Sequence, residues 1–186
     1  MKIASGTTVP RTPITLLPAQ PAEFPAFKRD LQAAFALAVV EEMGCLAEGP
    51  IPSDADLDRS LNDPSAIVLH ILHDDRRVGG VVVTIDRDTQ ANSLDLLFVK
   101  VGNQGKGLGK ATSLAIEEMF PDTRSWQTLT PCFEKRNIHF YVNVCGFHIV
   151  EYYHERKPDP HTFCPTGLPD DSEMFRFVKK MPQSSG

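Results

Sequence analysis

The most constraining feature of this sequence is an apolar strand that runs through a glycine-rich turn directly into a helix. We expect the strand at residues 94–101 and the helix at about residues 107–120. Gly105 lies between them, and Gly107 and Gly109 lie in the first turn of the helix. Because glycine lacks a Cβ atom, the backbone of such a turn can bend freely and an anion can approach its N–H groups closely. The unpaired N–H groups and the positive dipole end of the helix point at the same place. The segment therefore predicts a cradle for the pyrophosphate of a nucleotide-like cofactor.

Spacing separates this turn from two common phosphate-binding motifs. A Walker loop needs a glycine where Gln104 stands and a serine or threonine where Ala111 stands. A dinucleotide fingerprint needs its third glycine where Lys110 stands, and it belongs early in a strand-helix-strand unit. The spacing that fits is Gln-x-x-Gly-x-Gly, from Gln104 to Gly109. In this respect the chain resembles the acetyl-coenzyme A loop of the GNAT superfamily of N-acetyltransferases.

The resemblance extends over about residues 94–153. Val99 stands five positions before Gln104, where the family ends the strand that binds the pantetheine arm, and residues 137–147 resemble the family's asparagine, tyrosine and terminal Gly-Phe. There is one departure, because Tyr141 precedes Gly146 by five residues instead of the family's four. We expect a single wide helical turn to absorb the extra residue, so that Tyr141 still faces the reacting thiol.

The resemblance implies a fold, a reaction and a set of site residues. The fold is α/β (α+β), with a mixed, mostly antiparallel central sheet flanked by helices and strands that splay at the cofactor site, in a single domain over residues 1–186. The implied reaction is direct transfer of an acetyl group from acetyl-CoA, without a metal, to a primary amine of an unidentified acceptor. Tyr141 is the expected catalytic residue, protonating the departing thiolate. The expected cofactor-binding residues are Phe98, Val99, Gln104, Gly105, Lys106, Gly107, Leu108, Gly109, Lys110 and Asn137.

Candidates on the acceptor side follow from position in the resembling fold. Glu41 and Glu42 end a long helix that often borders the acceptor pocket, and His139 neighbours Tyr141 and has a suitable intrinsic pKa for proton transfer. The loop at residues 154–171 is long for a compact domain, which indicates a binding role. The acceptor is either a small molecule or a peptide, and a homodimer is a further expectation from the resemblance. The alternative function is a sensor or regulatory module that binds CoA or acetyl-CoA without turnover.

The remaining elements are expected from periodicity and turn residues. The helix at residues 26–43 repeats apolar residues every four positions, and the helix after Gly107 carries Leu108, Ala111, Ala115 and Met119 on one face. Ser53 precedes a short acidic helix as its N-cap. Strands are expected at residues 12–17, 66–72, 78–85, 125–130, 147–153 and 174–180, and a further helix at residues 134–144.

Composition narrows the class of partner and the compartment. The net charge of −5 and the absence of a basic cluster interleaved with aromatic residues argue against nucleic-acid binding. No apolar run reaches the ~18 residues of a spanning helix, and the first residues lack the apolar core of a secretory signal, so we expect no membrane association and a cytoplasmic location. Cys45, Cys132, Cys145 and Cys164 are widely spaced, as is typical of reduced thiols. His154, His161 and Cys164 lack the spacing of a zinc site.

Overall fold

The computed structural model describes residues 13–44, 49–160 and 173–182. In these ranges the strands are β1 (Thr15–Pro18), β2 (Ala66–His73), β3 (Arg76–Thr84), β4 (Ala91–Val99), β5 (Ser125–Pro131), β6 (His148–Tyr153) and β7 (Met174–Lys180). The helices are a short 3-10 helix (Pro21–Glu23), α1 (Phe24–Met43), α2 (Asp54–Leu61), α3 (Leu108–Met119) and α4 (Lys135–His139), which continues as a π-helix over Phe140–Val144.

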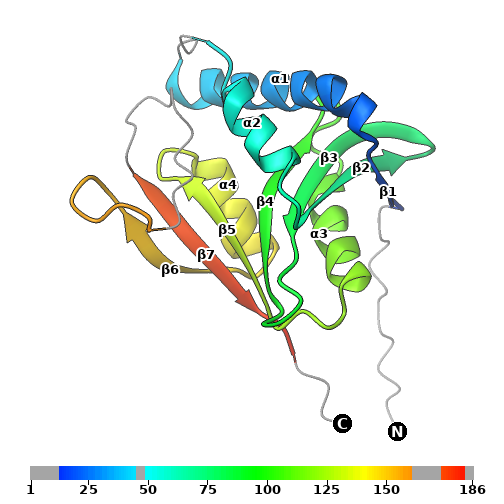
Figure 1. The fold of residues 1–186 in the computed structure, drawn as a ribbon. Coiled ribbons are helices and arrows are strands. Elements are labelled where there is room, and N and C mark those ends of the chain that lie inside the picture. Colours follow the sequence, from blue (N-terminus) through cyan, green and yellow to red (C-terminus); the bar gives the residue numbers. More distant parts are fainter. Residues whose placement is uncertain (1–12, 45–48, 161–172, 183–186) are drawn as a thin grey trace, which may run out of the picture.

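The strands described form one seven-stranded mixed sheet in the order β1-β2-β3-β4-β5-β7-β6. Every neighbouring pair is antiparallel except β4 and β5, which run parallel. Helices flank the sheet, with α1 and α2 crossing it and α3 and α4 lying on either side of the line where β4 meets β5 (Figure 1). This is the mixed, mostly antiparallel architecture that the sequence predicted.

Two apolar cores hold the helices to the sheet. One core contains Phe27 and Leu31 of α1 and Leu57 of α2, packed on residues of β2, β3 and β4. The other joins α3 and the π-helix to residues of β2, β3, β5 and β7. Gly80 of β3 is needed for the first core, because a Cβ atom there would lie 2.2 Å from the ring of Phe27. The missing side chain of Gly80 therefore leaves room for the aromatic ring of Phe27.

The strands β4 and β5 pair only at one end, and this positions the site. Their parallel register covers Ala91–Ser93 opposite Ser125–Gln127, and beyond it the two strands separate. On its other side β4 stays paired with β3 through Val99, with one irregularity, because Val82 lies opposite Leu96 whereas Val83 lies opposite Leu94. Asp95 is thus the extra residue of a β-bulge, a feature that bends a strand and redirects a side chain. The splayed strands expected from the sequence are present.

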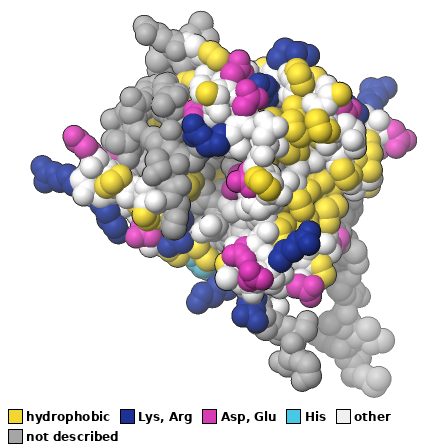
Figure 2. Space-filling model, in the orientation of Figure 1, with side chains coloured by type: hydrophobic (Ala, Val, Ile, Leu, Met, Phe, Trp, Pro, Cys, Tyr) yellow, Lys and Arg dark blue, Asp and Glu magenta, His cyan; other side chains and the backbone are white. Residues whose placement is uncertain are grey.

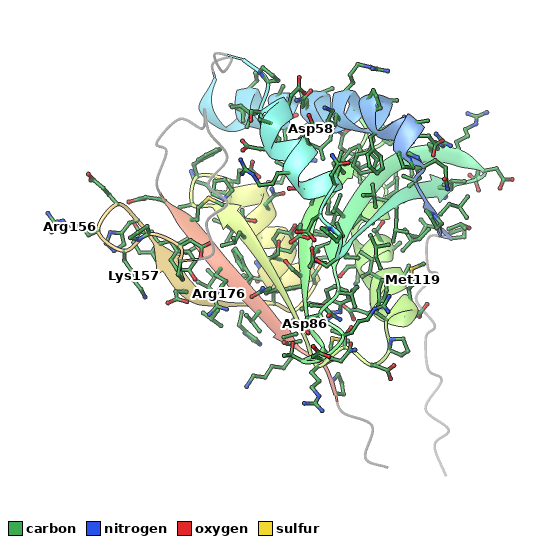
Figure 3. All side chains as sticks on the ribbon, viewed as in Figure 1. Asp58, Asp86, Met119, Arg156, Lys157 and Arg176 are labelled. Atoms are coloured by element: carbon green, nitrogen blue, oxygen red, sulfur yellow. The ribbon has the colours of Figure 1, made fainter. Side chains whose placement is uncertain are left out.

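Local signals predicted some elements correctly and one helix face wrongly. Ser53 caps α2 as expected, since its Oγ accepts the N–H of Asp56 at 3.2 Å. In α3, however, the buried residues are Leu108, Thr112, Ser113 and Ile116. Met119, labelled in Figure 3, lies at the end of α3 and is 43% exposed. The Thr112 hydroxyl donates to the Leu108 carbonyl at 2.8 Å, and this bond satisfies a polar group that apolar periodicity excludes from the core.

The surface of the described part carries charges of both signs. Figure 2 shows Asp and Glu side chains lying among Lys and Arg side chains on the face seen there. None of the helices described is long and apolar enough to cross a membrane.

Candidate functional site

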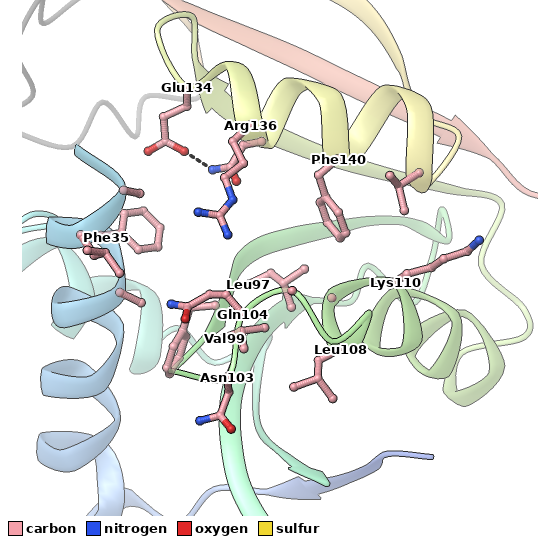
Figure 4. A pocket seen from close by; sticks show the side chains of 18 of the residues that line it. Phe35, Leu97, Val99, Asn103, Gln104, Leu108, Lys110, Glu134, Arg136 and Phe140 are labelled. Atoms are coloured by element: carbon pink, nitrogen blue, oxygen red, sulfur yellow. Dashed lines mark hydrogen bonds between the residues drawn. The ribbon is translucent and has the colours of Figure 1, made fainter. Parts of the chain in front are cut away.

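A cavity of about 290 Å³ opens beside the glycine-rich turn, and we call it the glycine-loop cavity. Side chains from α1, from the end of β4 and its following turn, and from α4 face one another across it (Figure 4). Its lining residues are Ala34, Phe35, Leu37, Ala38, Leu97, Phe98, Val99, Asn103, Gln104, Gly105, Gly107, Leu108, Gly109, Lys110, Glu134, Arg136, Asn137, Phe140, Tyr141 and Val144.

The turn has the backbone geometry that its glycines predict. Gly105 and Gly107 have φ angles of 79° and 72°, in the left-handed region that glycine adopts without steric cost. Gly107 is the N-cap of α3 and offers no side chain to its first turn, whose residues Leu108 and Gly109 line the cavity. The first N–H groups of a helix have no acceptor within the helix and can bind a ligand there. Lys110 lines the same cavity. The arrangement suits an anionic group at the start of α3.

Gly109 has a different role in the structure. A Cβ atom at this position would lie 3.1 Å from the ring of Phe140. The absence of a side chain therefore lets α3 pack closely against the helix that carries Tyr141. The third glycine of the motif sets the distance between the two helices that border the cavity.

The separation of β4 from β5 leaves one edge of β4 without a strand partner over residues 94–99, within the chain described. Backbone N–H and C=O groups along that edge are available to an extended ligand, because such groups pair wherever a partner exists. Leu97, Phe98 and Val99 of this edge line the glycine-loop cavity. A ligand held at the start of α3 can thus extend along β4.

A second cavity of about 360 Å³ lies between β4 and β5, and we call it the β4–β5 cavity. It is lined by residues of the parting strands together with residues of α1, α2 and β7. Its charged lining residues are Arg59, Asp63, Asp95, Glu134, Asp159 and Arg176. Arg176 extends from β7 (Figure 3). Its guanidinium donates to the Glu151 carboxylate at 3.0 Å. Among the residues described, the two cavities share Phe35, Leu97, Glu134, Asn137 and Tyr141.

Tyr141 lies where the two cavities meet. The π-helix widens the turn at this point, with the Cys145 N–H donating to the Phe140 carbonyl at 3.0 Å. The wide turn expected from the sequence is therefore present. The ring is 7% exposed and packs against Phe147 and Phe177. Burial raises the pKa of the Tyr141 hydroxyl, although its hydrogen bond with Thr128 acts in the opposite direction. The phenol consequently remains protonated at neutral pH and can act as a proton donor.

Glu134 and Asn137 form the third side of this meeting point. Glu134 is the N-cap of α4 and is 4% exposed. The side-chain amide of Asn137 donates to the Glu134 carboxylate, as the dashed line in Figure 4 shows. A buried carboxylate therefore lies between the two cavities, and its orientation is fixed by a neighbour one helical turn away.

Asp95, the bulged residue of β4, supplies a second carboxylate to the β4–β5 cavity. The hydroxyls of Thr84 and Ser93 donate to its two oxygens at 2.6 and 2.5 Å. Partial loss of hydration beside the surrounding protein raises the pKa of its carboxyl, although the side chain still reaches solvent in the cavity. The neighbouring charge of Asp63 adds to the rise in pKa, whereas the two hydroxyls oppose it. A cation in the cavity would relieve this repulsion between carboxylates.

The structure brings most of the sequence candidates together. Of the ten cofactor-binding candidates, Lys106 does not line either cavity, and the other nine line the glycine-loop cavity. Glu41 also lines neither, and its carboxylate pairs with Arg136 at 2.8 Å. His139 is exposed, lines neither cavity and contacts Asn143 at 2.9 Å. The Glu42 side chain and residues 161–171 of the long loop lie outside the residues described.

Sequence reasoning missed Asp95, Glu134 and Phe35 as cavity residues. A signal existed for Asp95, since an acid stands inside an apolar strand and the adjacent Leu96 and Leu97 break its alternation, as a bulge does. For Glu134 the sequence offered only its spacing of three residues from Asn137. Phe35 belongs to the apolar stripe of α1, but it lines both cavities.

Within the described ranges, His, Cys, Asp and Glu side chains form no group of three that could hold a metal ion. His161 and Cys164, two of the three residues considered as zinc ligands, lie outside these ranges. Cys132 and Cys145 are free thiols. Burial raises the pKa of Cys132 to about 11 and also raises that of Cys145, which disfavours a nucleophilic thiolate at either position.

Comparison with known proteins gives a family and a fold. The Acetyltransferase (GNAT) family matches residues 30–147. A protein of Bacillus subtilis (strain 168), the uncharacterized protein YrkN, is 49% identical over 168 residues, which are 88% of this chain and 91% of YrkN.

Solved acetyltransferase structures share the fold at low sequence identity. A GNAT family acetyltransferase from Elizabethkingia anophelis with acetyl-CoA bound aligns with a TM-score of 0.63 at 15% identity, covering 90% of this chain and 98% of that one. Spermidine N-acetyltransferase from Vibrio cholerae, in complex with CoA and spermine, aligns with a TM-score of 0.63 at 13% identity, covering 90% and 95%.

Proposed function

The chain belongs to the GNAT family of acetyltransferases, and from this premise we propose that it transfers an acetyl group from acetyl-CoA to a primary amine. The observation that carries the proposal is the meeting of two cavities at Tyr141, one beside the glycine-rich turn and one between the parting strands. Direct transfer needs a bound thioester and a bound amine that reach the same point from different sides. This arrangement supplies both approaches.

In the proposal, acetyl-CoA occupies the glycine-loop cavity. Its pyrophosphate binds at Gln104–Lys110, where the backbone of Gly105 and Gly107 and the first turn of α3 present N–H groups. The pantetheine arm extends along the unpaired edge of β4 near Val99. The fold neighbour from Elizabethkingia anophelis, which has acetyl-CoA bound, supports this choice of co-substrate.

The amine acceptor occupies the β4–β5 cavity. Carboxylates outnumber guanidinium groups among the lining residues described there, and Asp95 is the carboxylate held in place by two hydroxyls. Such a lining favours an ammonium group over an acid. The name of the Vibrio cholerae neighbour, a spermidine N-acetyltransferase, supports an amine as the acceptor.

The chemistry is direct attack of the neutral amine on the thioester carbonyl. Backbone N–H groups on the free edge of β4 can stabilise the oxygen as it gains charge. The Tyr141 hydroxyl, kept protonated by its burial, delivers a proton to the departing thiolate. Because Tyr141 lines both cavities, it is within reach of a thiol that arrives through the glycine-loop cavity.

Two measurements test this function. Calorimetry with acetyl-CoA, CoA and ATP should show binding of the first two and none of the third. A thiol-trapping assay should then detect release of CoA when acetyl-CoA is mixed with a panel of primary amines, including diamines, amino acids and peptide N-termini. Binding of acetyl-CoA with no release above background for any amine would indicate a CoA-binding sensor instead of an enzyme.

A further inference from the structure

An acceptor amine carries a proton at neutral pH, and a protonated nitrogen has no electron pair with which to attack a carbonyl. Because alkylamines lose this proton only near pH 10, as the reference lysine does, a transferase needs a group that takes it inside the site. We propose that the carboxylate of Glu134 is this proton acceptor. The inference rests on the proposed acetyl transfer and assigns a catalytic residue to it.

Glu134 lies where the two cavities meet. Acetyl transfer occurs where the glycine-loop cavity meets the β4–β5 cavity, and the described residues that line both are Phe35, Leu97, Glu134, Asn137 and Tyr141. Of these, Glu134 is the one whose side chain carries a carboxylate. Tyr141 is the other ionisable group, but its raised pKa suits it to donate a proton and not to accept one.

Glu134 is also buried and held in place by hydrogen bonds. A glutamate with 4% exposure is unusual for a residue type that is almost always solvated unless it is paired. Its backbone is held by two hydrogen bonds, from its own N–H to the Pro131 carbonyl and from the Ile138 N–H to its own carbonyl. The Asn137 amide donates to one carboxylate oxygen, and so directs the group within the meeting point. A base held in this way needs little rearrangement when the substrate arrives.

Asp95 is the competing carboxylate, and its surroundings separate the two roles. Asp95 lines the β4–β5 cavity but not the glycine-loop cavity, and hydroxyls already donate to both of its oxygens. It can hold an ammonium group from the acceptor side. Glu134 contacts the region that the thioester must also enter, and it lies near enough to Tyr141 for its charge to raise the tyrosine pKa.

The ammonium nitrogen of the acceptor loses two of its three protons in the reaction. Glu134 takes one proton from the bound ammonium and releases it to solvent, which leaves a neutral amine that attacks the carbonyl carbon. As the C–N bond forms and the C–S bond breaks, the nitrogen loses its second proton to Glu134. Tyr141 gives its proton to the thiolate and regains one from Glu134. The products are the acetylated amine, CoA with its thiol protonated, and one proton in solvent.

The test compares Glu134→Gln with the wild type, using acetyl-CoA and the best acceptor from the amine panel. Glutamine keeps the size of the side chain but cannot accept the proton, and we expect kcat/KM at neutral pH to fall by about 10²- to 10⁴-fold. Glu117→Gln is the matched control, because Glu117 is also largely buried, pairs with Lys179 at 2.6 Å and lines neither cavity. It should retain wild-type activity, and thermal unfolding and acetyl-CoA binding should show that both variants are folded.

Two further readouts separate proton transfer from a structural role. The wild type can use the ammonium form, whereas the variant needs the neutral amine. Below the pKa of the free amine, kcat/KM should therefore fall more steeply with decreasing pH in the variant than in the wild type. A β-fluorinated analogue of the same amine, whose ammonium is more acidic, should restore much of the lost rate in Glu134→Gln. Equal losses for both amines, or an unchanged pH profile, would overturn the proposal.

Three other results would refute the role of Glu134 as proton acceptor. A pH profile altered by Asp95→Asn but not by Glu134→Gln would make Asp95 the proton acceptor and refute the role of Glu134. If Glu134→Gln keeps wild-type activity, Glu134 is not the proton acceptor, and the proposed acetyl transfer still stands. If the wild type binds acetyl-CoA and acetylates no amine, the proposed function fails first, and this inference fails with it.

Discussion

Replacing Tyr141 by phenylalanine removes one oxygen atom and should separate packing from proton delivery. The ring contacts with Phe147 and Phe177 remain, and the loss is the hydroxyl and its hydrogen bond with Thr128. One buried neutral hydrogen bond contributes about 1 kcal/mol to stability. The melting temperature should therefore fall by about 2–4 °C, as expected for a chain of this length. The fold and the affinity for acetyl-CoA should be retained.

The effect on rate should be much larger than the effect on stability. If Tyr141 protonates the thiolate, kcat should fall by about 10²- to 10⁴-fold, which corresponds to about 3–5 kcal/mol of activation free energy. Thr128→Val is the matched control, because it removes the same hydrogen bond and leaves the phenol in place. We expect that variant to lose similar stability and to keep kcat within a few-fold of the wild type.

The assays are thermal unfolding and steady-state release of CoA at saturating acetyl-CoA. Because burial raises the pKa of Tyr141 in the folded state, the unfolded tyrosine ionises first as pH rises. The wild type should therefore lose stability above about pH 10, and Tyr141→Phe should lose less of it. A kcat of Tyr141→Phe within a few-fold of the wild type would refute proton delivery and leave Tyr141 a packing residue.

Three further predictions concern the cofactor, the acceptor and the stability of the fold. Gly107→Glu should abolish acetyl-CoA binding in calorimetry, because it places bulk and negative charge at the start of α3. The control Gly107→Asn should still bind measurably, because asparagine tolerates the φ angle of 72° at this position. Equal affinities of Gly107→Glu and the wild type for acetyl-CoA would place the cofactor elsewhere. Asp95→Asn should raise KM for a cationic amine by about 10- to 100-fold, because it loses a charge-assisted hydrogen bond of about 1.5–3 kcal/mol. KM for acetyl-CoA should change little, and an unchanged KM for the amine would show that Asp95 does not bind the acceptor. Hydrogen bonds from the Gln20 N–H and the Arg77 guanidinium lower the pKa of Glu23 to about 2, so its contribution to stability is complete above the unfolded pKa of 4.5 and is lost as pH falls from 4.5 towards 2. In denaturant titrations over this pH range, the free energy of unfolding should depend less on pH for Glu23→Gln than for the wild type. An identical pH dependence in the two proteins would contradict the lowered pKa of Glu23.

The geometry of the glycine-rich turn and of the helix that carries Tyr141 was largely predictable because its signals are local. Glycine at positions 105 and 107 indicates backbone conformations that other residues avoid, and both residues adopt them. The extra residue between Tyr141 and Gly146 predicted a wide turn, and the π-helix over Phe140–Val144 confirms it. In each case the residues that determine the geometry are neighbours in the chain.

The lining of the β4–β5 cavity was not predictable in the same way, because its residues come from distant segments. The sequence candidates Glu41 and His139 line neither cavity. Asp95 lines the β4–β5 cavity, and Glu134 lines both cavities. Which carboxylate enters a cavity depends on where two strands separate and how one of them bulges, and periodicity carries neither quantity. The exposure of Met119 on α3 has the same origin, since helix orientation depends on the surface available for packing.

Local sequence signals were enough to predict the main helices and strands, their order and the glycine-rich turn, since each depends on backbone preferences and periodicity within a few residues. Where the splay of β4 and β5 begins, after the pairing of residues 91–93 with residues 125–127, became known only from the packed sheet. The tertiary structure also placed Glu134 and Tyr141 where two cavities meet. The physical reason is range, because a conformational preference acts within a few residues of chain, whereas a cavity is the space left by elements that pack from far apart in the sequence.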